Sequence, residues 1–162
     1  MAQSRNGPEE LRIRKACNED VGFLNDLAFR AKASHGYDDA FMAACRQEIA
    51  VQPATLIERE VWVAEASNGC IVGFFGLWPP ENGKSEVDPV YVEPLFHGRG
   101  IGSALWRQLE RQAKLAGARS VRLDSDPHAV EFYRRMGCSV IGQSPSGSIR
   151  GRLLPRMEKS IL

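Results

Sequence analysis

Three glycines at alternate positions, Gly98, Gly100 and Gly102, stand between a β-rich run and a strongly amphipathic run of the sequence. Glycine is unfavourable inside regular elements because it loses the most backbone freedom on folding, so this spacing predicts a turn in which the backbone itself has a role. A strand that leads through such a turn into a helix places unpaired N–H groups and the positive end of the helix dipole against the same point. The pattern therefore predicts an anion-binding turn in a fold that combines strands and helices.

The run after the glycines has a clear helical period. Ile101, Leu105 and Leu109 fall on one face of the expected helix, and Gly117 is placed to end it. Helices are also expected at 18–34, 40–49 and 128–136. Alternating or continuous apolar runs predict strands at 11–16, 61–66, 71–78, 85–92, 120–124, 138–142 and 152–161. This order predicts one α/β domain over residues 1–162, with a mixed central sheet of about six to seven strands flanked by about four helices, and residues 1–10 as a flexible leader.

Composition narrows the class of protein further. The 162 residues include 43% hydrophobic and 25% charged residues, as in ordinary globular domains. The net charge of +1 gives no reason to expect a nucleic acid or an anionic membrane as partner, and no apolar run is long enough to span a bilayer. The polar N-terminus does not resemble a signal peptide, and the four cysteines, without metal-ligand spacing, predict buried free thiols. We expect a cytoplasmic protein without a metal.

Several anions and one purely structural role are compatible with the glycines. A P-loop is excluded because no Lys-Ser or Lys-Thr pair follows them. A dinucleotide-binding fold stays open as an alternative, because Asp124 ends the next expected strand, where such folds place the acid that binds the ribose. Against it, Ser103 stands at the third glycine position, and that motif normally lies in a first βαβ unit. Tight packing at the turn is the structural alternative.

Two blocks of the sequence resemble a known family. HGRGIGSAL (97–105) is similar to the acyl-CoA signature Q/R-x-x-G-x-G/A of the GNAT (GCN5-related N-acetyltransferase) superfamily. DPHAVEFYRRMGC (126–138) is similar to a second block of that family, N-x-x-A-x-x-F-Y-x-x-x-G-F. The departures are His97 for Gln or Arg, Asp126 for Asn and Cys138 for Phe. Both blocks stand in the family's order and at its separation, so the resemblance implies the GNAT fold from about residue 11 to residue 162.

The resemblance implies acetyl-CoA as cofactor, with its pyrophosphate in the glycine turn. It also implies that the strand at 85–92 splays from its neighbour and that the pantetheine arm lies in the gap, against backbone groups of Val90 and Val92. An N–H group of this strand would then stabilise the charge that develops on the thioester oxygen. The implied cofactor-binding residues are Val90, Tyr91, Val92, His97, Gly98, Arg99, Gly100, Ile101, Gly102, Ser103, Asp126, Ala129, Phe132 and Tyr133.

Acyl transfer to an amine requires a base for the ammonium group and an acid for the departing sulfur. The resemblance implies Tyr133 as the acid, and we expect its surroundings to close the gap between the pKa values of a thiol and a phenol. Glu86 stands where several members of the family carry a catalytic glutamate, and Asp88 shares its face of the strand, so either is a candidate base. Packing of Tyr133 and solvation of both carboxylates are the structural alternatives.

The acceptor is expected to be a primary amine of a small molecule or a peptide. The segments that frame the acceptor site in the family correspond to 28–42 and 143–155, and their motifs resemble a bacterial GNAT subgroup of unknown substrate. Lys32, Tyr37, Arg150 and Arg152 are candidates to recognise an anionic group on the acceptor, unless they are only solvated charges. His35 and His128 have no partner visible in the sequence and are expected at the surface or in helix caps.

The prediction is therefore an acetyl-CoA-dependent N-acetyltransferase. A non-catalytic acyl-CoA-binding module is the main alternative, because the fold can persist without the chemistry. A C-terminal edge strand makes a homodimer a further prediction.

Overall fold

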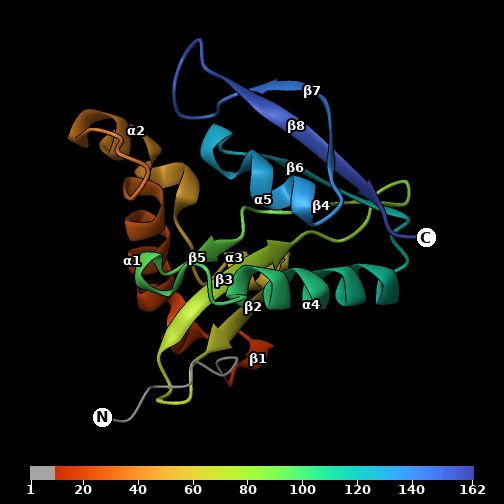
Figure 1. Cartoon of the computed structure of the whole chain (residues 1–162), viewed down its shortest axis with the longest axis horizontal. Coiled ribbons are helices and arrows are strands. Elements are labelled where there is room, and N and C mark those ends of the chain that lie inside the picture. Colours follow the sequence, from red (N-terminus) through yellow and green to blue (C-terminus); the bar gives the residue numbers. More distant parts are fainter. Residues whose placement is uncertain (1–9) are drawn as a thin grey trace, which may run out of the picture.

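The computed structural model describes residues 10–162, which form eight strands, five α-helices and three short 3-10 helices (Figure 1). The leader expected at 1–10 lies outside the described residues except for Glu10, which is exposed. The strands are β1 (Arg12–Lys15), β2 (Glu60–Glu65), β3 (Ile71–Leu77), β4 (Lys84–Glu86), β5 (Tyr91–Val92), β6 (Ser120–Asp124), β7 (Ser139–Pro145) and β8 (Leu153–Ser160). The helices are η1 (Asn18–Asp20), α1 (Val21–Ala33), α2 (Asp39–Ile49), α3 (Thr55–Glu58), η2 (Pro94–Phe96), α4 (Ile101–Leu115), η3 (Pro127–Ala129) and α5 (Val130–Arg135).

The strands form two four-stranded sheets, whereas one central sheet of six to seven strands was expected. The first sheet has the order β1-β2-β3-β5 and is antiparallel throughout, and the second has the order β4-β6-β8-β7. Among the described strands, β4 and β6 are the parallel pair. The two sheets meet where β4 continues into β5.

The expected strand at 85–92 is split between the two sheets. The N–H of Val87 donates to the carbonyl of Arg122 in β6 at 2.8 Å, and the N–H of Asp88 then donates to the carbonyl of Gly76 in β3 at 2.9 Å. Pro89, which has no N–H to donate, follows at the point where the pairing with β3 slips by one residue. Beyond Val87 the chain thus leaves β6 and stays with β3, which opens the predicted gap between β5 and β6.

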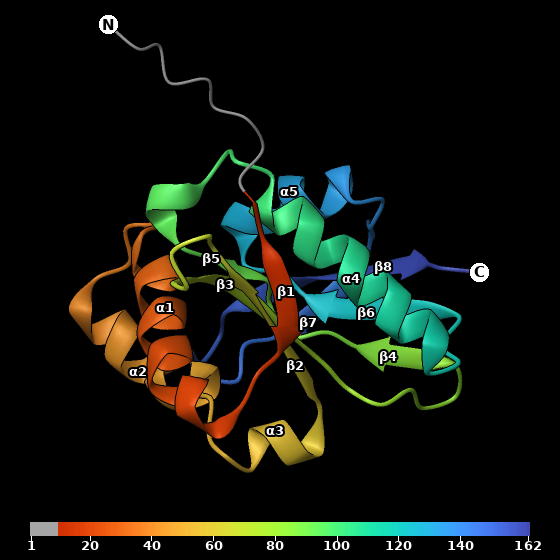
Figure 2. The same cartoon turned by 90° about the horizontal axis from the view of Figure 1, so that it is seen from below.

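Helices cover both faces of the first sheet (Figure 2). Val63 and Phe74 pack with residues of α1, whereas Ala64 and Phe75 pack with residues of α4. Because both faces are covered, β3 reads as a nearly continuous apolar run without polar alternation. The core thus holds α1 and α4 on opposite sides of the strand that leads to the gap.

Three further expectations can be compared with the described residues. Cys45 and Cys138 are buried as expected, but Cys17 and Cys70 are exposed. The C-terminal strand β8 lies inside its sheet, and the largely exposed β7 is at the edge instead, so the expected C-terminal edge strand is wrong for β8 and a homodimer stays a prediction. Among the described helices, none is long and apolar enough to cross a membrane.

Candidate active site

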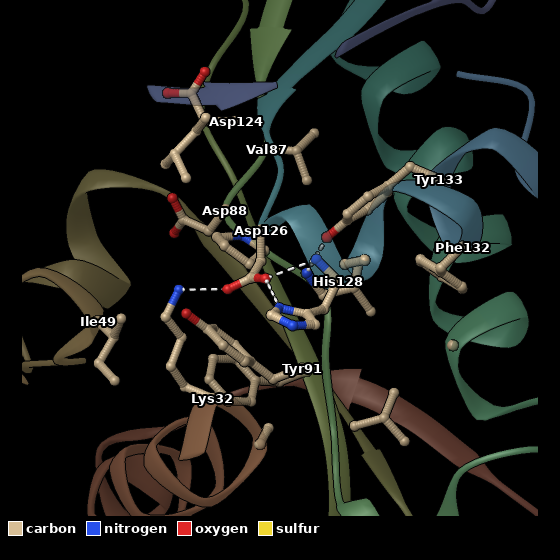
Figure 3. Close-up of a pocket in the computed structure, with 18 of the residues that line it drawn as sticks. Lys32, Ile49, Val87, Asp88, Tyr91, Asp124, Asp126, His128, Phe132 and Tyr133 are labelled. Carbon is tan, nitrogen blue, oxygen red and sulfur yellow. Dashed lines mark hydrogen bonds and ion pairs between the residues drawn. The ribbon is translucent and has the colours of Figure 1, made fainter. Parts of the chain in front are cut away.

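A cavity of about 980 Å³ lies at the gap between the sheets (Figure 3). It extends from the glycine turn past the segment 87–92 and α5 to α1, α2 and the loop 146–152 between β7 and β8. All three catalytic candidates line it, as do Lys32 and Arg152, and so does every cofactor candidate apart from Arg99. The guanidinium group of Arg99 lies over the ring of Phe96 at 4.7 Å from its centroid. The structure therefore brings both family blocks to one cavity.

The three glycines serve two different purposes. Gly98 and Gly100 have φ values of 78° and 79°, in the left-handed region that side chains rarely adopt, and Gly100 is the N-cap of α4. Gly102 lies inside α4, where a Cβ atom would stand 2.8 Å from the ring of Phe132. The first two glycines thus shape the turn, and the third allows α5 to approach the first turn of α4.

The backbone of the segment 90–92 already has partners. The N–H of Val90 donates to the hydroxyl of Tyr133 at 3.0 Å, and Nε2 of His97 lies 3.2 Å from the carbonyl oxygen of Val92. Val92 and Tyr91 also pair with Gly73 and Phe74 of β3. His97, which stands where the family has Gln or Arg, therefore links the glycine turn to the end of β5.

Tyr133 is almost completely buried, with 1% of its surface exposed, and its hydroxyl reaches the cavity. Burial raises the pKa of Tyr133 well above its usual range, although the hydrogen bond from Val90 acts in the opposite direction. The surroundings thus widen the pKa gap that we expected them to close, and the phenol stays protonated near neutral pH. Because the hydroxyl oxygen accepts from Val90, its own O–H remains directed elsewhere.

Each candidate base is paired with an arginine. Glu86 is half-exposed and forms an ion pair with Arg156, which also contacts Asp124 at 3.2 Å. Asp88 forms an ion pair with Arg59 at 2.7 Å and accepts a hydrogen bond from the indole of Trp78 at 3.1 Å. Both carboxylates line the cavity with fixed orientations, so neither is a freely solvated charge.

Asp126 is the centre of the most extensive polar cluster in the cavity. It forms an ion pair with Lys32 at 2.8 Å, accepts a hydrogen bond from the hydroxyl of Tyr37 at 2.9 Å and lies 3.7 Å from the guanidinium of Arg152. Its Oδ1 also lies 2.9 Å from the backbone nitrogen of His128 and 3.0 Å from Nδ1 of the same residue. We call Asp126, Lys32, Tyr37, His128 and Arg152 the Asp126 cluster.

The electrostatics of the cluster follow from these contacts. Burial alone opposes ionisation of Asp126, whose side chain is 11% exposed, but its contacts with Lys32 and His128 outweigh burial and hold its pKa well below the usual range. Burial and the hydrogen bond to Asp126 raise the pKa of Tyr37 to about 12. Near neutral pH the cluster thus contains one carboxylate, two cations and a neutral phenol.

Sequence reasoning missed part of this arrangement. His128 is exposed and in a helix cap as expected, but its contacts with the side chain of Asp126 and, by stacking at 4.9 Å between ring centroids, with His35 were not expected. The D-P-H spacing at a helix start could have indicated the first contact, because an aspartate at an N-cap accepts from the N–H two residues later. The contacts of Asp126 with Lys32 and Arg152 join distant segments and had no sequence signal. Arg150 lies exposed on the loop between β7 and β8, outside the residues that line the cavity.

The dinucleotide alternative does not fit this architecture. A dinucleotide-binding fold places its glycine turn after the first strand of a parallel sheet, whereas this turn follows β5 of an antiparallel sheet. Asp124, its candidate ribose-binding acid, is paired with Arg156 of β8. The fold and the two motif blocks define an acyltransferase class instead.

Comparison with known proteins agrees. A family model described as "Acetyltransferase (GNAT) family" matches residues 24–138, which is well over half of the chain. The chain belongs to the GNAT acetyltransferase family. The matched range runs from α1 to the residue before β7, so β1, β7, β8 and the loop 146–152 lie outside it.

Individual relatives are distant. An uncharacterized N-acetyltransferase of Methanocaldococcus jannaschii is 41% identical over 56 residues, which are 33% of this chain and 25% of that protein. The chloroplastic serotonin N-acetyltransferase 2 of Oryza sativa subsp. japonica is 28% identical over 151 residues, which are 91% of this chain and 68% of that protein. The alignments with the first curated relatives span only about a quarter to a half of the length of those proteins.

A similar solved structure supports the fold. The PaiA N-acetyltransferase of Thermoplasma acidophilum, crystallised in complex with coenzyme A, superposes with a TM-score of 0.77 at 20% identity. The superposition covers 93% of this chain and 99% of that chain. At this identity the likeness shows the GNAT fold, including the elements outside the range of the family model.

Proposed function

We propose that this protein transfers an acetyl group from acetyl-CoA to the primary amine of a small molecule or a peptide. The observation that carries the proposal is the hydrogen bond between the N–H of Val90 and the hydroxyl of Tyr133, inside a cavity continuous with the glycine turn. This hydrogen bond connects the splayed strand, through Val90, to the second family block, through Tyr133. A buried tyrosine held there has the position required of an acid for a departing sulfur.

The residues present fit coenzyme A. The left-handed Gly98 and Gly100 leave the start of α4 without side chains in front of its first N–H groups, which suits a pyrophosphate. Gly102, Phe132 and Ala129 form the adjoining wall. Acetyl-CoA supplies an activated acetyl group and a thiolate leaving group. The complex of the PaiA N-acetyltransferase with coenzyme A supports this assignment by fold.

Tyr133 would donate its hydroxyl proton to the departing sulfur. Burial disfavours the phenolate, but it disfavours a thiolate in the same place as well, so the proton transfer is less uphill than the pKa of Tyr133 alone implies. The hydrogen bond from Val90 fixes the oxygen, which leaves the O–H to point at the leaving group. This geometry supports the acid role more directly than it supports a packing role.

Glu86 or Asp88 would accept the proton of the acceptor ammonium group, directly or through water. Asp88 lies two residues before Val90, and the side chain of Glu86 is the more exposed of the two, at 49% against 33%. Glu86→Gln and Asp88→Asn distinguish them. The variant that lacks the base should lose at least about 100-fold in kcat and keep its affinity for acetyl-CoA. If both variants keep their turnover, neither carboxylate is the base.

The first test of the proposed function is ligand binding followed by turnover. Thermal unfolding is measured with acetyl-CoA, CoA, NAD and ATP, and a ligand at about 100 times its Kd adds roughly 2.7 kcal/mol of stability. For a domain of this size that corresponds to a rise in Tm of several degrees, expected with both CoA species and not with NAD. Thiol release from acetyl-CoA is then followed with a panel of primary amines. Binding without turnover on any amine would favour the non-catalytic module, and no binding of either CoA species would overturn the proposal.

A further inference from the structure

Lys32, Tyr37 and Arg152 converge on one point, as expected for a site that recognises an anion. They come from α1, from the turn between α1 and α2, and from the residue before β8. The hydroxyl of Tyr37 also accepts a hydrogen bond from Arg152 at 2.7 Å, and both cations lie over the rings of Tyr37 and Phe41 at 4.8–5.9 Å from the ring centroids. Lys32 and Arg152 line the cavity, and Tyr37, which does not line it, bonds to Arg152 and Asp126.

The anion at that point is supplied by the protein itself. The carboxylate of Asp126 makes an ion pair of 2.8 Å with Lys32 and approaches Arg152 to 3.7 Å, and the side chains of Lys32 and Arg152 are only 14% and 18% exposed. An acceptor carboxylate would need these same donors. It would also be repelled by the charge of Asp126 itself, because like charges in a poorly solvated site interact strongly.

We propose that Asp126 determines acceptor specificity: its carboxylate occupies the anion position between Lys32, Tyr37 and Arg152, so the enzyme takes primary amines that carry no carboxylate beside the amine and rejects the corresponding amino acids. The proposal rests on the proposed function, since it concerns the acceptor of that reaction. It replaces the expectation that Lys32, Tyr37 and Arg152 bind an anionic acceptor.

The other walls of the cavity agree with this assignment. Glu48, Glu86 and Asp88 line the side toward α2 and β4, and the rings of Trp78 and Tyr91 lie among them. The carboxylates and rings suit a cationic amine with an apolar body. Arg59 and Lys84 also line this side, and Arg59 is already paired with Asp88. Among the described cations that line the cavity, Lys32 and Arg152 are the pair that contacts one shared carboxylate, that of Asp126.

The charge of Asp126 can be removed with little change of shape. Asparagine keeps an oxygen that accepts from the N–H of His128, so Asp126→Asn retains the cap of η3 while it leaves Lys32 and Arg152 without their counter-ion. Asp124→Asn is the matched control, because Asp124 lines the same cavity but has Arg156 as its partner. The double variant Asp126→Asn, Lys32→Met also removes Lys32, so that Arg152 is the one cation left at the position of the Asp126 carboxylate.

The first readout is selectivity between amines that differ only in the carboxylate, tryptamine against tryptophan and phenylethylamine against phenylalanine. For the wild type we expect kcat/KM to favour the amine without the carboxylate, and Asp126→Asn should shift the ratio toward the amino acid by about tenfold or more. Asp124→Asn should leave the ratio unchanged. Equal turnover of both partners by the wild type, or an unchanged ratio in Asp126→Asn, would overturn the proposal.

The second readout needs no turnover. Indole-3-acetate, a carboxylate without an amine, is titrated calorimetrically into each variant after circular dichroism has confirmed that it folds. We expect binding at least about tenfold tighter to Asp126→Asn than to the wild type, and loss of that gain in the double variant. No gain in Asp126→Asn would overturn the proposal. If the wild type binds acetyl-CoA but acetylates no amine, the proposed function fails while this titration still decides the role of Asp126.

Discussion

At the scale of single residues, Tyr133 accepts a hydrogen bond from Val90 and is also the proposed acid for the departing sulfur. Its hydroxyl is the partner of an N–H group at the point where the strand is split, and its ring lies in the core against Trp106 and Phe132. The ring is buried and the hydroxyl oxygen accepts from Val90, so the O–H can donate to another group. Loss of the hydroxyl oxygen should therefore lower both the stability of the strand and the rate of acetyl transfer. Unfolding and kinetic measurements separate these two effects.

We expect Tyr133→Phe to lower kcat by about 100-fold or more while the Kd for acetyl-CoA changes by less than about threefold. The variant leaves the N–H of Val90 without its partner, which should cost about 1 kcal/mol of stability. Steady-state kinetics, calorimetry with acetyl-CoA and thermal unfolding measure the three quantities. Unchanged kcat together with the loss of stability would assign Tyr133 to the fold alone.

At the scale of elements, the approach of α5 to α4 joins the two family blocks. Gly102 permits this approach, since a side chain there would meet the ring of Phe132. The glycine thus has a packing role, although it belongs to the same motif as the two turn-forming glycines. The contact with Phe132 gives Gly102 a packing role whether or not it also faces the cofactor.

Gly102→Ala should destabilise the protein by about 1–3 kcal/mol and weaken acetyl-CoA binding, because Phe132 and α5 must move away from the turn. Gly22→Ala is the control, since Gly22 is exposed inside α1 and has open space around its Cβ position. That variant should be more stable by about 0.5–1 kcal/mol, because alanine loses less backbone freedom. Urea unfolding compares both, and a neutral Gly102→Ala would show that α5 is not held by this contact.

At the scale of the whole molecule, stability should depend on pH through carboxylates that are paired in the folded state. A hydrogen bond from Arg14, opposed by burial, holds the pKa of Asp20 at about 2, below its unfolded value of 3.8. This carboxylate ties β1 to the start of α1, and Arg14 also contacts Glu65 of β2. A lowered folded pKa stabilises the protein above the unfolded pKa, and that stabilisation is lost as the pH falls toward the folded pKa.

The free energy of unfolding should therefore fall by about 2 kcal/mol from Asp20 alone between pH 4 and pH 2. Asp20→Asn should be less stable than the wild type at pH 6 and show a shallower slope below pH 4. Asp26→Asn, which changes an exposed residue of α1, serves as the control. Denaturant unfolding at a series of pH values measures the slopes, and parallel curves for Asp20→Asn and the wild type would contradict the role of Asp20.

Much of the fold and part of the site could be predicted from the sequence, because they depend on local patterns. The period of α4 and the glycines before it are local features, and they indicated the GNAT family, which the family match confirms. The range 85–92 was predicted as a strand, but its split depends on a competition between β3 and β6 for the same hydrogen bonds. The family resemblance implied that this strand splays, and the structure shows that the chain leaves β6 after Val87.

Sequence alone thus determined the class of fold and the family, and it indicated the residues of the glycine turn. Only the tertiary structure decided what those residues contact. Lys32 and Asp126 are 94 residues apart in the chain, and their ion pair exists because the fold brings α1 and the N-cap of η3 together at the same cavity. The expected cations are present, but the protein fills their anion position with its own carboxylate, since charges buried together must be paired.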